Sequence, residues 1–221
     1  MLNIPLIIKI RIFATAFCLA PALAAALPPL GDNPIADGKI SVQSWKTQRD
    51  FGIVKQNLDF SCGAASIATL LNNFYGQHLT ETEILQRMNK TDWRASFDDM
   101  QRVMPELGFE AKGYALPFEQ LVRMKIPVIV YLKYRRDDHF SVLRGISGNT
   151  VLLADPSLGH VSMSRAQFLD AWKTREGNLA GKILAIVPKG VESGGDADFF
   201  TRRPKRQTAF AVEQVKRRSA Y

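Results

Sequence analysis

Cysteine and histidine are scarce in this sequence, whose 221 residues include two cysteines and three histidines. Two cysteines exclude a disulfide-dense scaffold and a four-cysteine zinc site, and they leave either one disulfide or one reactive thiol. The three histidines lack the i,i+4 spacing that would support a metal site on a helix, so neither a metal nor another cofactor is expected. Two of them, His78 and His160, are interpreted as loop and surface-strand residues. With 46% apolar residues, the chain is not an intrinsically disordered protein.

The N-terminal apolar run is too short to span a membrane. Ile12–Leu23 has about 12 residues, whereas a spanning helix needs roughly 20. Lys9 and Arg11 precede this run, and alanines at 22 and 24–26 offer A-x-A cleavage sites. Residues 1–26 are therefore predicted to be a secretory signal peptide that directs export to the periplasm. An uncleaved membrane anchor is the alternative.

Cleavage of this signal would change the number of thiols. Cys18 lies inside the apolar run, so a cut near Ala26 would remove it and leave Cys62 alone. The mature chain could then form no internal disulfide, although exported proteins enter an oxidising compartment. A lone thiol in such a compartment needs a functional explanation.

Acidic residues are too few to balance the basic ones at the two ends of the chain. The formal net charge is +8, from 29 Lys and Arg against 21 Asp and Glu. The predicted signal contributes +2 and residues 189–221 contribute +4, so the region between them carries only +2. A body of nearly balanced charge argues against nucleic-acid binding. Residues 189–221 are predicted to form a basic tail, either mostly disordered or a docking arm that contacts the cell envelope peripherally.

The hydrophobic pattern predicts an N-terminal extension at 27–44, with a strand at 40–45, and one α+β domain at 45–188. Helices are expected first, at residues 61–75, 80–88, 96–104 and 117–124. Strands are expected afterwards, at residues 127–134, 139–146, 150–155, 160–163 and 182–187, with one helix at 164–172. Helices followed by an antiparallel sheet are typical of an α+β architecture. The tryptophans are expected in the core or in a cleft wall: Trp45, Trp93 and Trp172.

Glycine and capping residues mark the expected ends of these helices. Gly76 follows the first helix as a C-cap. Thr80 and Glu83 form a capping-box pattern at the start of the second helix, and Ser164 is expected to cap the last one.

Cys62 lies at the start of the first predicted helix, where free N–H groups and the helix dipole favour a thiolate. Gly63 is expected to leave space beside the sulfur, and Asp59 and Ser61 are candidate N-caps. A buried structural cysteine at a helix start is the competing interpretation. The cysteine alone does not decide between the two.

A histidine and a carboxylate are expected beside this cysteine. The turn at Ser147–Asn149 predicts a hairpin whose strands place His139 and Asp155 near the same end. A cysteine, a histidine and a carboxylate are the nucleophile, base and orienting group of thiol catalysis. Gln56 lies six residues before Cys62, and its amide could join the Cys62 N–H in donating to an oxyanion.

These residues resemble the peptidase C39 family, a group of papain-like cysteine peptidases. The resemblance extends from Trp45 to Val187. It depends on residues 56–65 (QNLDFSCGAA), 139–143 (HFSVL) and 155–159 (DPSLG), with Tyr75-Gly76, Phe168 and Trp172. It implies a papain-like fold in which N-terminal helices pack on a C-terminal antiparallel sheet.

The resemblance also implies a role for each site residue of a cysteine endopeptidase. Cys62 looks like the nucleophile and His139 like the general base and acid. Asp155 looks like the residue that orients the histidine, and Gln56 like the oxyanion donor. No substrate-binding residue is identified at this stage.

Many C39 peptidases are N-terminal domains of ABC exporters and cleave leader peptides after a double glycine. This chain has its own predicted signal, lacks a G-x-x-x-x-G-K-S/T loop, and leaves no room for an ATPase after the domain. It therefore resembles the stand-alone exported members, among them the one encoded with bacterial functional-amyloid (Fap-type) secretion machinery. The implied substrate is an exported polypeptide, such as an amyloid subunit or a secretion component. A C39-like module that binds such a substrate without cleaving it is the alternative.

Overall fold

A computed structural model describes residues 44–89, 95–134, 137–174, 177, 179–190 and 194–204. The predicted signal peptide at 1–26, nearly all of the extension at 27–44, and Trp93 lie outside the described residues. All the described residues belong to one compact unit that begins at Gln43. None of the helices in this part of the chain is long and apolar enough to cross a membrane.

The described residues fold into helices and one six-stranded antiparallel sheet. The helices are α1 (Trp45–Arg49), α2 (Cys62–Tyr75), α3 (Glu81–Met88), α4 (Phe97–Val103), α5 (Phe118–Leu121) and α6 (Arg165–Trp172), with 3-10 helices η1 (Met104–Leu107) and η2 (Ala197–Phe199). The strands are β1 (Phe109–Leu116), β2 (Val128–Tyr134), β3 (Asp137–Ser147), β4 (Thr150–Asp155), β5 (Gly159–Ser164) and β6 (Gly181–Pro188). Their spatial order is β1-β6-β2-β3-β4-β5. The predicted α+β class is confirmed.

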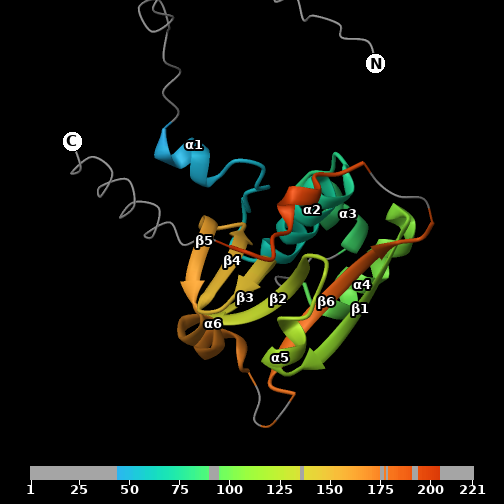
Figure 1. The fold of residues 1–221 in the computed structure, drawn as a ribbon. Helices are drawn as coiled ribbons and strands as arrows, with labels where there is room; N and C mark the ends of the chain where they lie inside the picture. Colours follow the sequence, from blue (N-terminus) through green and yellow to red (C-terminus); the bar gives the residue numbers. More distant parts are fainter. Residues whose placement is uncertain are drawn as a thin grey trace, which may run out of the picture. The chain divides into compact units, whose positions relative to one another are not determined.

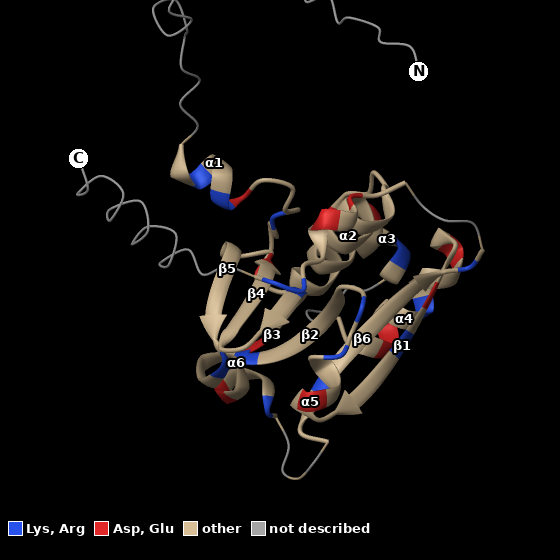
Figure 2. Ribbon diagram, in the orientation of Figure 1, with Lys and Arg blue, Asp and Glu red and all other residues tan. Residues whose placement is uncertain are grey.

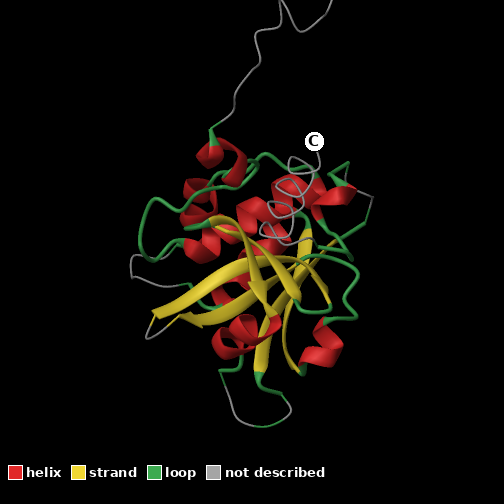
Figure 3. Ribbon diagram, turned by 60° about the vertical axis from the view of Figure 1, so that its left-hand side comes forward, coloured by secondary structure: helices red, strands yellow, loops and turns green. Residues whose placement is uncertain are grey.

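The sheet lies between two layers of helices (Figure 1; Figure 3). Helices α2, α3 and α4 pack on one face, and α5 and α6 pack on the other. Successive residues of a strand point to opposite faces. Ile129 of β2 accordingly belongs to the core under α2, whereas its neighbours Val128 and Val130 belong to the core under α6. Because both faces of β2 are covered over most of its length, residues 128–132 form a continuous apolar run.

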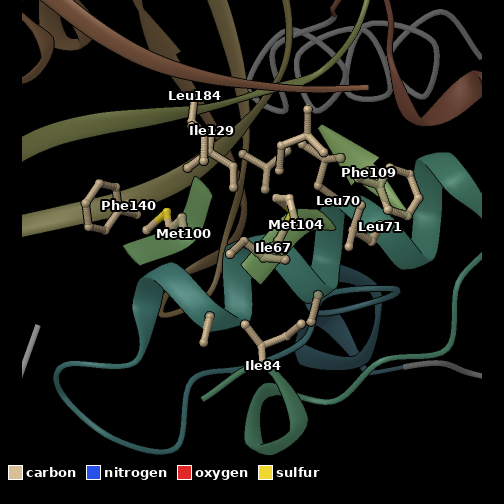
Figure 4. Close-up of a cluster of buried hydrophobic side chains, with 14 of the residues drawn as sticks. Ile67, Leu70, Leu71, Ile84, Met100, Met104, Phe109, Ile129, Phe140 and Leu184 are labelled. Atoms are coloured by element: carbon tan, nitrogen blue, oxygen red, sulfur yellow. The ribbon is translucent and has the colours of Figure 1, made fainter. Parts of the chain in front are cut away.

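Helix α2 forms the centre of the first core. Its sequence is rich in alanine and leucine, which favour the helical state. Ile67, Leu70 and Leu71 are fully buried in one cluster with Ile129 and Leu184 of the sheet (Figure 4). The start of α2 is thereby fixed relative to the central strands.

The C-terminal end of α2 is bonded to β6. Gly76 adopts a left-handed conformation with φ of 69° and ends the helix, as predicted. The Tyr75 hydroxyl donates to the Ile186 carbonyl oxygen at 2.6 Å. Burial raises the pKa of Tyr75 to about 12, so this hydroxyl remains a donor at neutral pH.

Capping boxes begin helices α3, α4 and α6, and each satisfies backbone N–H groups at the helix start. The pairs are Thr80 with Glu83, Ser96 with Asp99, and Ser164 with Gln167. The predicted starts of these helices are confirmed.

Strand β1 was not predicted from the sequence. Its residues, FEAKGYAL, include no β-branched side chain, and Glu, Lys, Gly and two Ala outnumber the strand-favouring Phe109 and Tyr114. Along its whole length β1 pairs with β6, from Phe109 opposite Pro188 to Leu116 opposite Gly181. The expectation that strands begin only after the helices at 61–124 is therefore wrong at β1, because a distant partner specifies this strand.

The prediction of a strand at 40–45 is wrong at its C-terminal end. Trp45 begins α1, and the Ser44 hydroxyl caps that helix by accepting from the Thr47 N–H at 3.1 Å. Residues 40–43 lie outside the described residues. Trp45 is 63% exposed, so the expectation of a core or cleft-wall position is also wrong for it.

Trp172 is instead a core residue, as predicted, and is only 1% exposed. Its ring stacks on Phe168 with centroids 5.5 Å apart, and its indole N–H donates to the Lys182 carbonyl oxygen at 3.1 Å. A Cβ atom at Gly181 would lie 2.2 Å from this ring. Only glycine therefore lets β6 approach the indole this closely.

Residues 194–204, which we call the C-terminal strap, lie against the domain. The Asp196 N–H donates to the Asn73 carbonyl oxygen at 2.7 Å. Further along, Phe199 is buried, and its carbonyl oxygen accepts from Arg144 Nε at 2.8 Å. This part of the predicted tail is therefore ordered, because the buried Phe199 ring anchors it to the domain. Residues 205–221 lie outside the described residues.

Glycine permits the strap to approach β3. This strand bulges between Leu143 and Gly145, and the Thr201 N–H donates to the Arg144 carbonyl oxygen at 2.8 Å. A Cβ atom at Gly145 would lie 1.9 Å from the Thr201 carbonyl oxygen. Any side chain at this position would displace the strap.

Charged residues of both signs are scattered over the described domain (Figure 2). Some pair locally, as Arg102 does with Asp99 at 2.8 Å within α4. Ion pairs with an exposed partner contribute little to stability. The fold therefore depends mainly on its two apolar cores.

Replacing Trp172 with alanine should lower the free energy of unfolding by about 3–5 kcal/mol, because it removes a large buried ring and leaves a cavity. Trp45→Ala is the matched control. Its exposed side chain should change the free energy by no more than about 0.5 kcal/mol. Urea denaturation followed by circular dichroism measures both values, and equal losses would contradict the placement of Trp172 in the core.

Candidate active site

Cys62 is the first residue of α2 and a free, buried cysteine. Its neighbour Gly63 is also buried, and a Cβ atom there would lie 2.3 Å from the Met100 methyl group. The sequence analysis expected Gly63 to leave space beside the sulfur. In the structure, the missing side chain instead admits Met100, which packs the start of α2 against α4.

The start of α2 has no side-chain cap. Ser61 occupies the N-cap position, but its hydroxyl donates to the Leu58 carbonyl oxygen at 2.8 Å and does not accept from the first turn. Asp59 is exposed and lines a pocket beside Cys62. Ser61 is therefore the N-cap residue, as one of the two candidates predicted, but it makes no side-chain capping bond, and Asp59 is not the N-cap. Among the described residues, the N-cap side chain therefore satisfies none of the N–H groups at the start of α2.

His139 and Asp155 are in direct contact. The His139 Nε2 atom lies 2.8 Å from Asp155 Oδ2. The Asp155 side chain is fully buried, and the His139 side chain is 12% exposed. Cys62 lies close enough to the His139 ring to raise its pKa. Because Asp155 occupies Nε2, Nδ1 is the ring nitrogen left for Cys62.

The β3–β4 hairpin brings these two residues together, as predicted. The strands pair from Ser147 opposite Thr150 to Val142 opposite Ala154. The β-bulge in β3 shifts this register by one residue. Beyond the last pair, His139 and Asp155 remain close enough to bond.

Asp155 also organises the turn that follows β4. Its Oδ1 atom accepts from the backbone N–H groups of Ser157 and Leu158, each at 2.9 Å. One carboxylate therefore uses one oxygen for the turn and the other for the histidine.

These contacts determine the charges in the site. Burial would lower the pKa of His139, but the hydrogen bonds to Asp155 and Cys62, together with their charges, raise it to about 9. Burial would raise the pKa of Asp155, but His139 and the two turn N–H groups hold it below its ordinary value. At neutral pH the ring is therefore a cation between a carboxylate and the Cys62 sulfur.

Gln56 joins the same turn. Its Oε1 accepts from the Ser157 hydroxyl at 2.7 Å, and its backbone N–H donates to the Pro156 carbonyl oxygen at 3.2 Å. Its Nε2 donates to the Leu58 carbonyl oxygen at 3.1 Å. The Gln56 amide and the Ser61 hydroxyl therefore donate to the same Leu58 carbonyl oxygen, and Ser61 is the residue immediately before Cys62.

The sequence profile of the Peptidase C39 family matches residues 50–176, a segment that includes Cys62, His139 and Asp155. The chain belongs to the peptidase C39 family. It is accordingly a cysteine peptidase, as the resemblance of its motifs implied.

Two curated relatives from Pseudomonas are similar to this C39 peptidase. The chain is 34% identical over 160 residues to the "Probable functional amyloid protease FapD" of Pseudomonas aeruginosa, which covers 69% of this chain and 68% of that protein. It is 32% identical over 158 residues to the protein of the same name from Pseudomonas fluorescens, with coverage of 68% and 67%. The predicted resemblance to Fap-type members of the family is confirmed.

Solved structures of peptidase domains have the same fold. One is a double glycine motif protease from an AMS/PCAT transporter, in complex with its leader peptide. The match covers 62% of this chain and 90% of that protease chain, with a TM-score of 0.52 and 25% sequence identity. The peptidase domain of Streptococcus ComA, a bi-functional ABC transporter, covers 62% and 97%, with a TM-score of 0.53 and 20% identity. The predicted papain-like fold is confirmed.

The other two histidines of the C39 domain lie in different environments. His78 is exposed in the loop after α2. The His160 ring lies 2.9 Å from Arg144 Nη1 and 3.0 Å from the Phe51 carbonyl oxygen. Burial and the Arg144 cation lower the pKa of His160. Within the described ranges, no group of three or more His, Cys, Asp or Glu residues is arranged to hold a metal ion.

No substrate-binding residue was predicted from the sequence, and the structure shows a pocket beside Cys62. This pocket has a volume of about 360 Å³ and is lined by Asp59, Phe60, Cys62, Ala95, Ser96, Phe97, Tyr131, Asp138, Phe140 and Lys182. The Lys182 ammonium lies 4.9 Å from the centre of the Tyr131 ring, whose hydroxyl bonds Asp138. Asp59, Phe60 and Cys62 lie in one of the quoted motifs and Phe140 in another, but the other lining residues come from separate elements and belong to no motif. Only the tertiary fold could have identified them as neighbours.

Asp155→Asn should lower the pH at which His139 loses its proton. In the wild type, the NMR signals of the ring should titrate near pH 9. Loss of the carboxylate charge should lower this midpoint by roughly 1–3 units. The asparagine carbonyl oxygen can still accept the turn N–H groups, so the turn itself should persist.

Asp170→Asn, an exposed change of the same kind on α6, is the control and should leave the midpoint unchanged. Because the folded-state pKa of His139 lies above its ordinary 6.5, its contribution to stability is complete below about pH 6.5. That contribution is lost as the pH rises through about 9. A midpoint that remains near 9 in Asp155→Asn would contradict the assigned contact.

Proposed function

We propose that this chain is an exported cysteine endopeptidase that hydrolyses a peptide bond in a secreted protein or peptide. Cys62 is the nucleophile, His139 is the general acid and base, and Asp155 orients His139. The observation that carries this proposal is the 2.8 Å contact between His139 and Asp155, with Cys62 at the start of α2 near enough to raise the pKa of the same ring. A cysteine, a histidine and an orienting carboxylate in contact are the arrangement that thiol catalysis requires.

The first half-reaction forms a thioester. The Cys62 thiolate attacks the carbonyl carbon of the scissile bond, so that a C–S bond forms and the carbonyl electrons move to oxygen. His139 then donates its Nδ1 proton to the leaving nitrogen as the C–N bond breaks. The C-terminal product leaves, and the N-terminal part of the substrate remains on Cys62.

The second half-reaction releases the acyl group. The neutral His139 ring takes a proton from water, and the oxygen of that water attacks the thioester carbon. The C–S bond then breaks, the N-terminal product leaves as a carboxylic acid, and Cys62 is again a thiolate beside a protonated ring. Asp155 stabilises the charged ring in each half-reaction.

An oxyanion forms twice in this cycle and needs hydrogen-bond donors. The Cys62 N–H and the Gln56 amide are the proposed donors. The absence of a side-chain cap on α2 and the position of Gln56 Nε2 beside Leu58 support this assignment. Such preorganised donors are often the largest single contribution to catalysis.

The proposed location is the periplasm, reached through the signal at 1–26. The proposed substrate is a polypeptide of a functional-amyloid export system, such as a subunit or a secretion component. The names of the two Pseudomonas relatives support this substrate class. The specificity for a double glycine motif that belongs to the transporter protease is not part of the proposal.

Cells that produce the wild-type chain should contain protein N-termini that are missing when Cys62 is replaced with alanine, because the variant lacks the nucleophile. His139→Ala should lose the same N-termini. Mass spectrometry of labelled N-termini from the envelope fraction measures the difference. It also shows whether the chain itself begins near Leu27, as cleavage of the signal would require.

His78→Ala is the matched control, since it removes an exposed histidine outside the site, and it should retain the N-termini. If Cys62→Ala produces every N-terminus that the wild type produces, the peptidase role is wrong. Capture of an envelope polypeptide by both proteins would then favour the module that binds without cleaving.

A further inference from the structure

A second buried carboxylate lies near the site and takes no part in the proposed triad. Glu81 is in the first turn of α3 and is only 4% exposed. Its Oε1 accepts from the Asn57 backbone N–H at 2.9 Å, and its Oε2 accepts from Asn57 Nδ2 at 2.5 Å. Glutamate is rarely buried to this extent unless it is paired. Here both carboxylate oxygens bond the same loop residue.

That loop residue follows Gln56 directly. On its other side, the loop is bonded to the turn after Asp155, through Lys55 and Gln56. The Lys55 ammonium donates to the Ser157 carbonyl oxygen at 2.6 Å, and the Ser157 hydroxyl donates to Gln56 Oε1 at 2.7 Å. Gln56 therefore lies between one anchor at the turn and a second anchor at Glu81.

Two anchors are needed to orient the Gln56 amide. The Leu58 carbonyl oxygen can only accept, so it selects the Nε2 end of the amide, and Oε1 is left to accept from the Ser157 hydroxyl. The Nε2 end then lies at the Leu58 carbonyl oxygen, one residue beyond Asn57. The path of the backbone from Gln56 to Leu58 sets this position, and Glu81 holds the residue in the middle of it.

We infer that Glu81 is a positioning residue, which holds the loop so that the Gln56 amide can donate to the oxyanion. This inference rests on the proposed function and deepens it. Glu81 touches neither the sulfur nor the imidazole in the described contacts. Its effect on the reaction passes through Asn57 and Gln56.

A carboxylate suits this task better than an amide. Asn57 presents two donors, and a carboxylate offers two acceptor oxygens. A glutamine at position 81 would offer one acceptor and would place an NH2 donor against a donor. Because Glu81 is buried, water cannot easily replace the bond that its side chain loses. Glu81→Gln keeps the side-chain volume and changes only this match.

Two probes that differ in their need for an oxyanion test the inference on the purified full chain. Acylation by p-nitrophenyl acetate passes through an oxyanion, whereas alkylation by iodoacetamide does not. Glu81→Gln should slow the release of p-nitrophenol by about tenfold, a part of the effect of losing an oxyanion donor outright. It should leave the rate of alkylation of Cys62 unchanged.

Glu83→Gln is the matched control. It makes the same chemical change in the first turn of α3, but its carboxylate bonds Thr80 rather than the loop. Both rates should stay at the wild-type value. Asn57→Ala approaches the same contact from the exposed loop and should slow acylation as Glu81→Gln does, even if the buried variant folds poorly.

A double-mutant cycle shows whether the effect passes through Gln56. In a Gln56→Ala background, Glu81→Gln should slow acylation no further. The inference is overturned if Glu81→Gln and Asn57→Ala leave acylation unchanged, or if they slow alkylation as much as acylation. It is also overturned if Glu81→Gln and Gln56→Ala slow acylation additively. If Cys62→Ala releases p-nitrophenol at the wild-type rate, the proposed function itself is contradicted.

Discussion

The buried carboxylate of Asp155 is the interaction on which the rest of the site depends. One oxygen holds the His139 ring, and the other holds the backbone of the next turn. Removing this charge from water is costly, and the cost is offset only because the imidazolium and two N–H groups surround it. The orientation of the histidine and the shape of the turn are therefore set together. A change in one reaches the other through a single side chain.

The turn carries this coupling further, to the loop before α2. Ser157 gives its backbone N–H to Asp155 and its hydroxyl to Gln56. The same loop is bonded to α3 by Glu81. The loop before α2 therefore contacts both α3, which precedes β1 in the sequence, and the turn after β4, which follows it. The proposed base and the proposed oxyanion donor consequently share one hydrogen-bonded framework. Few of its members would be recognised as functional from their residue type.

The sequence predicted the parts of this arrangement that depend on neighbours along the chain. Capping residues such as Thr80 marked the helix starts, and the turn at Gly148 gave the hairpin that joins His139 to Asp155. The contacts of Gln56 with Ser157, which are 101 residues apart, follow from packing and have no local signal. Strand β1 was not predicted for the same reason, because its pairing with the distant strand β6 specifies it. Motif resemblance supplied the role of Gln56, but not the contacts that hold it.

The bond from Tyr75 to Ile186 joins the first long helix to the last strand. A ribosome makes β6 after every other strand of the sheet, and until then α2 lacks part of the surface on which it packs and β1 lacks its partner. Contacts so distant in sequence form late in folding. A nascent chain would thus carry the thiol and the histidine without a finished framework to hold them. The order of the strands postpones assembly of the site until synthesis of the domain is nearly complete.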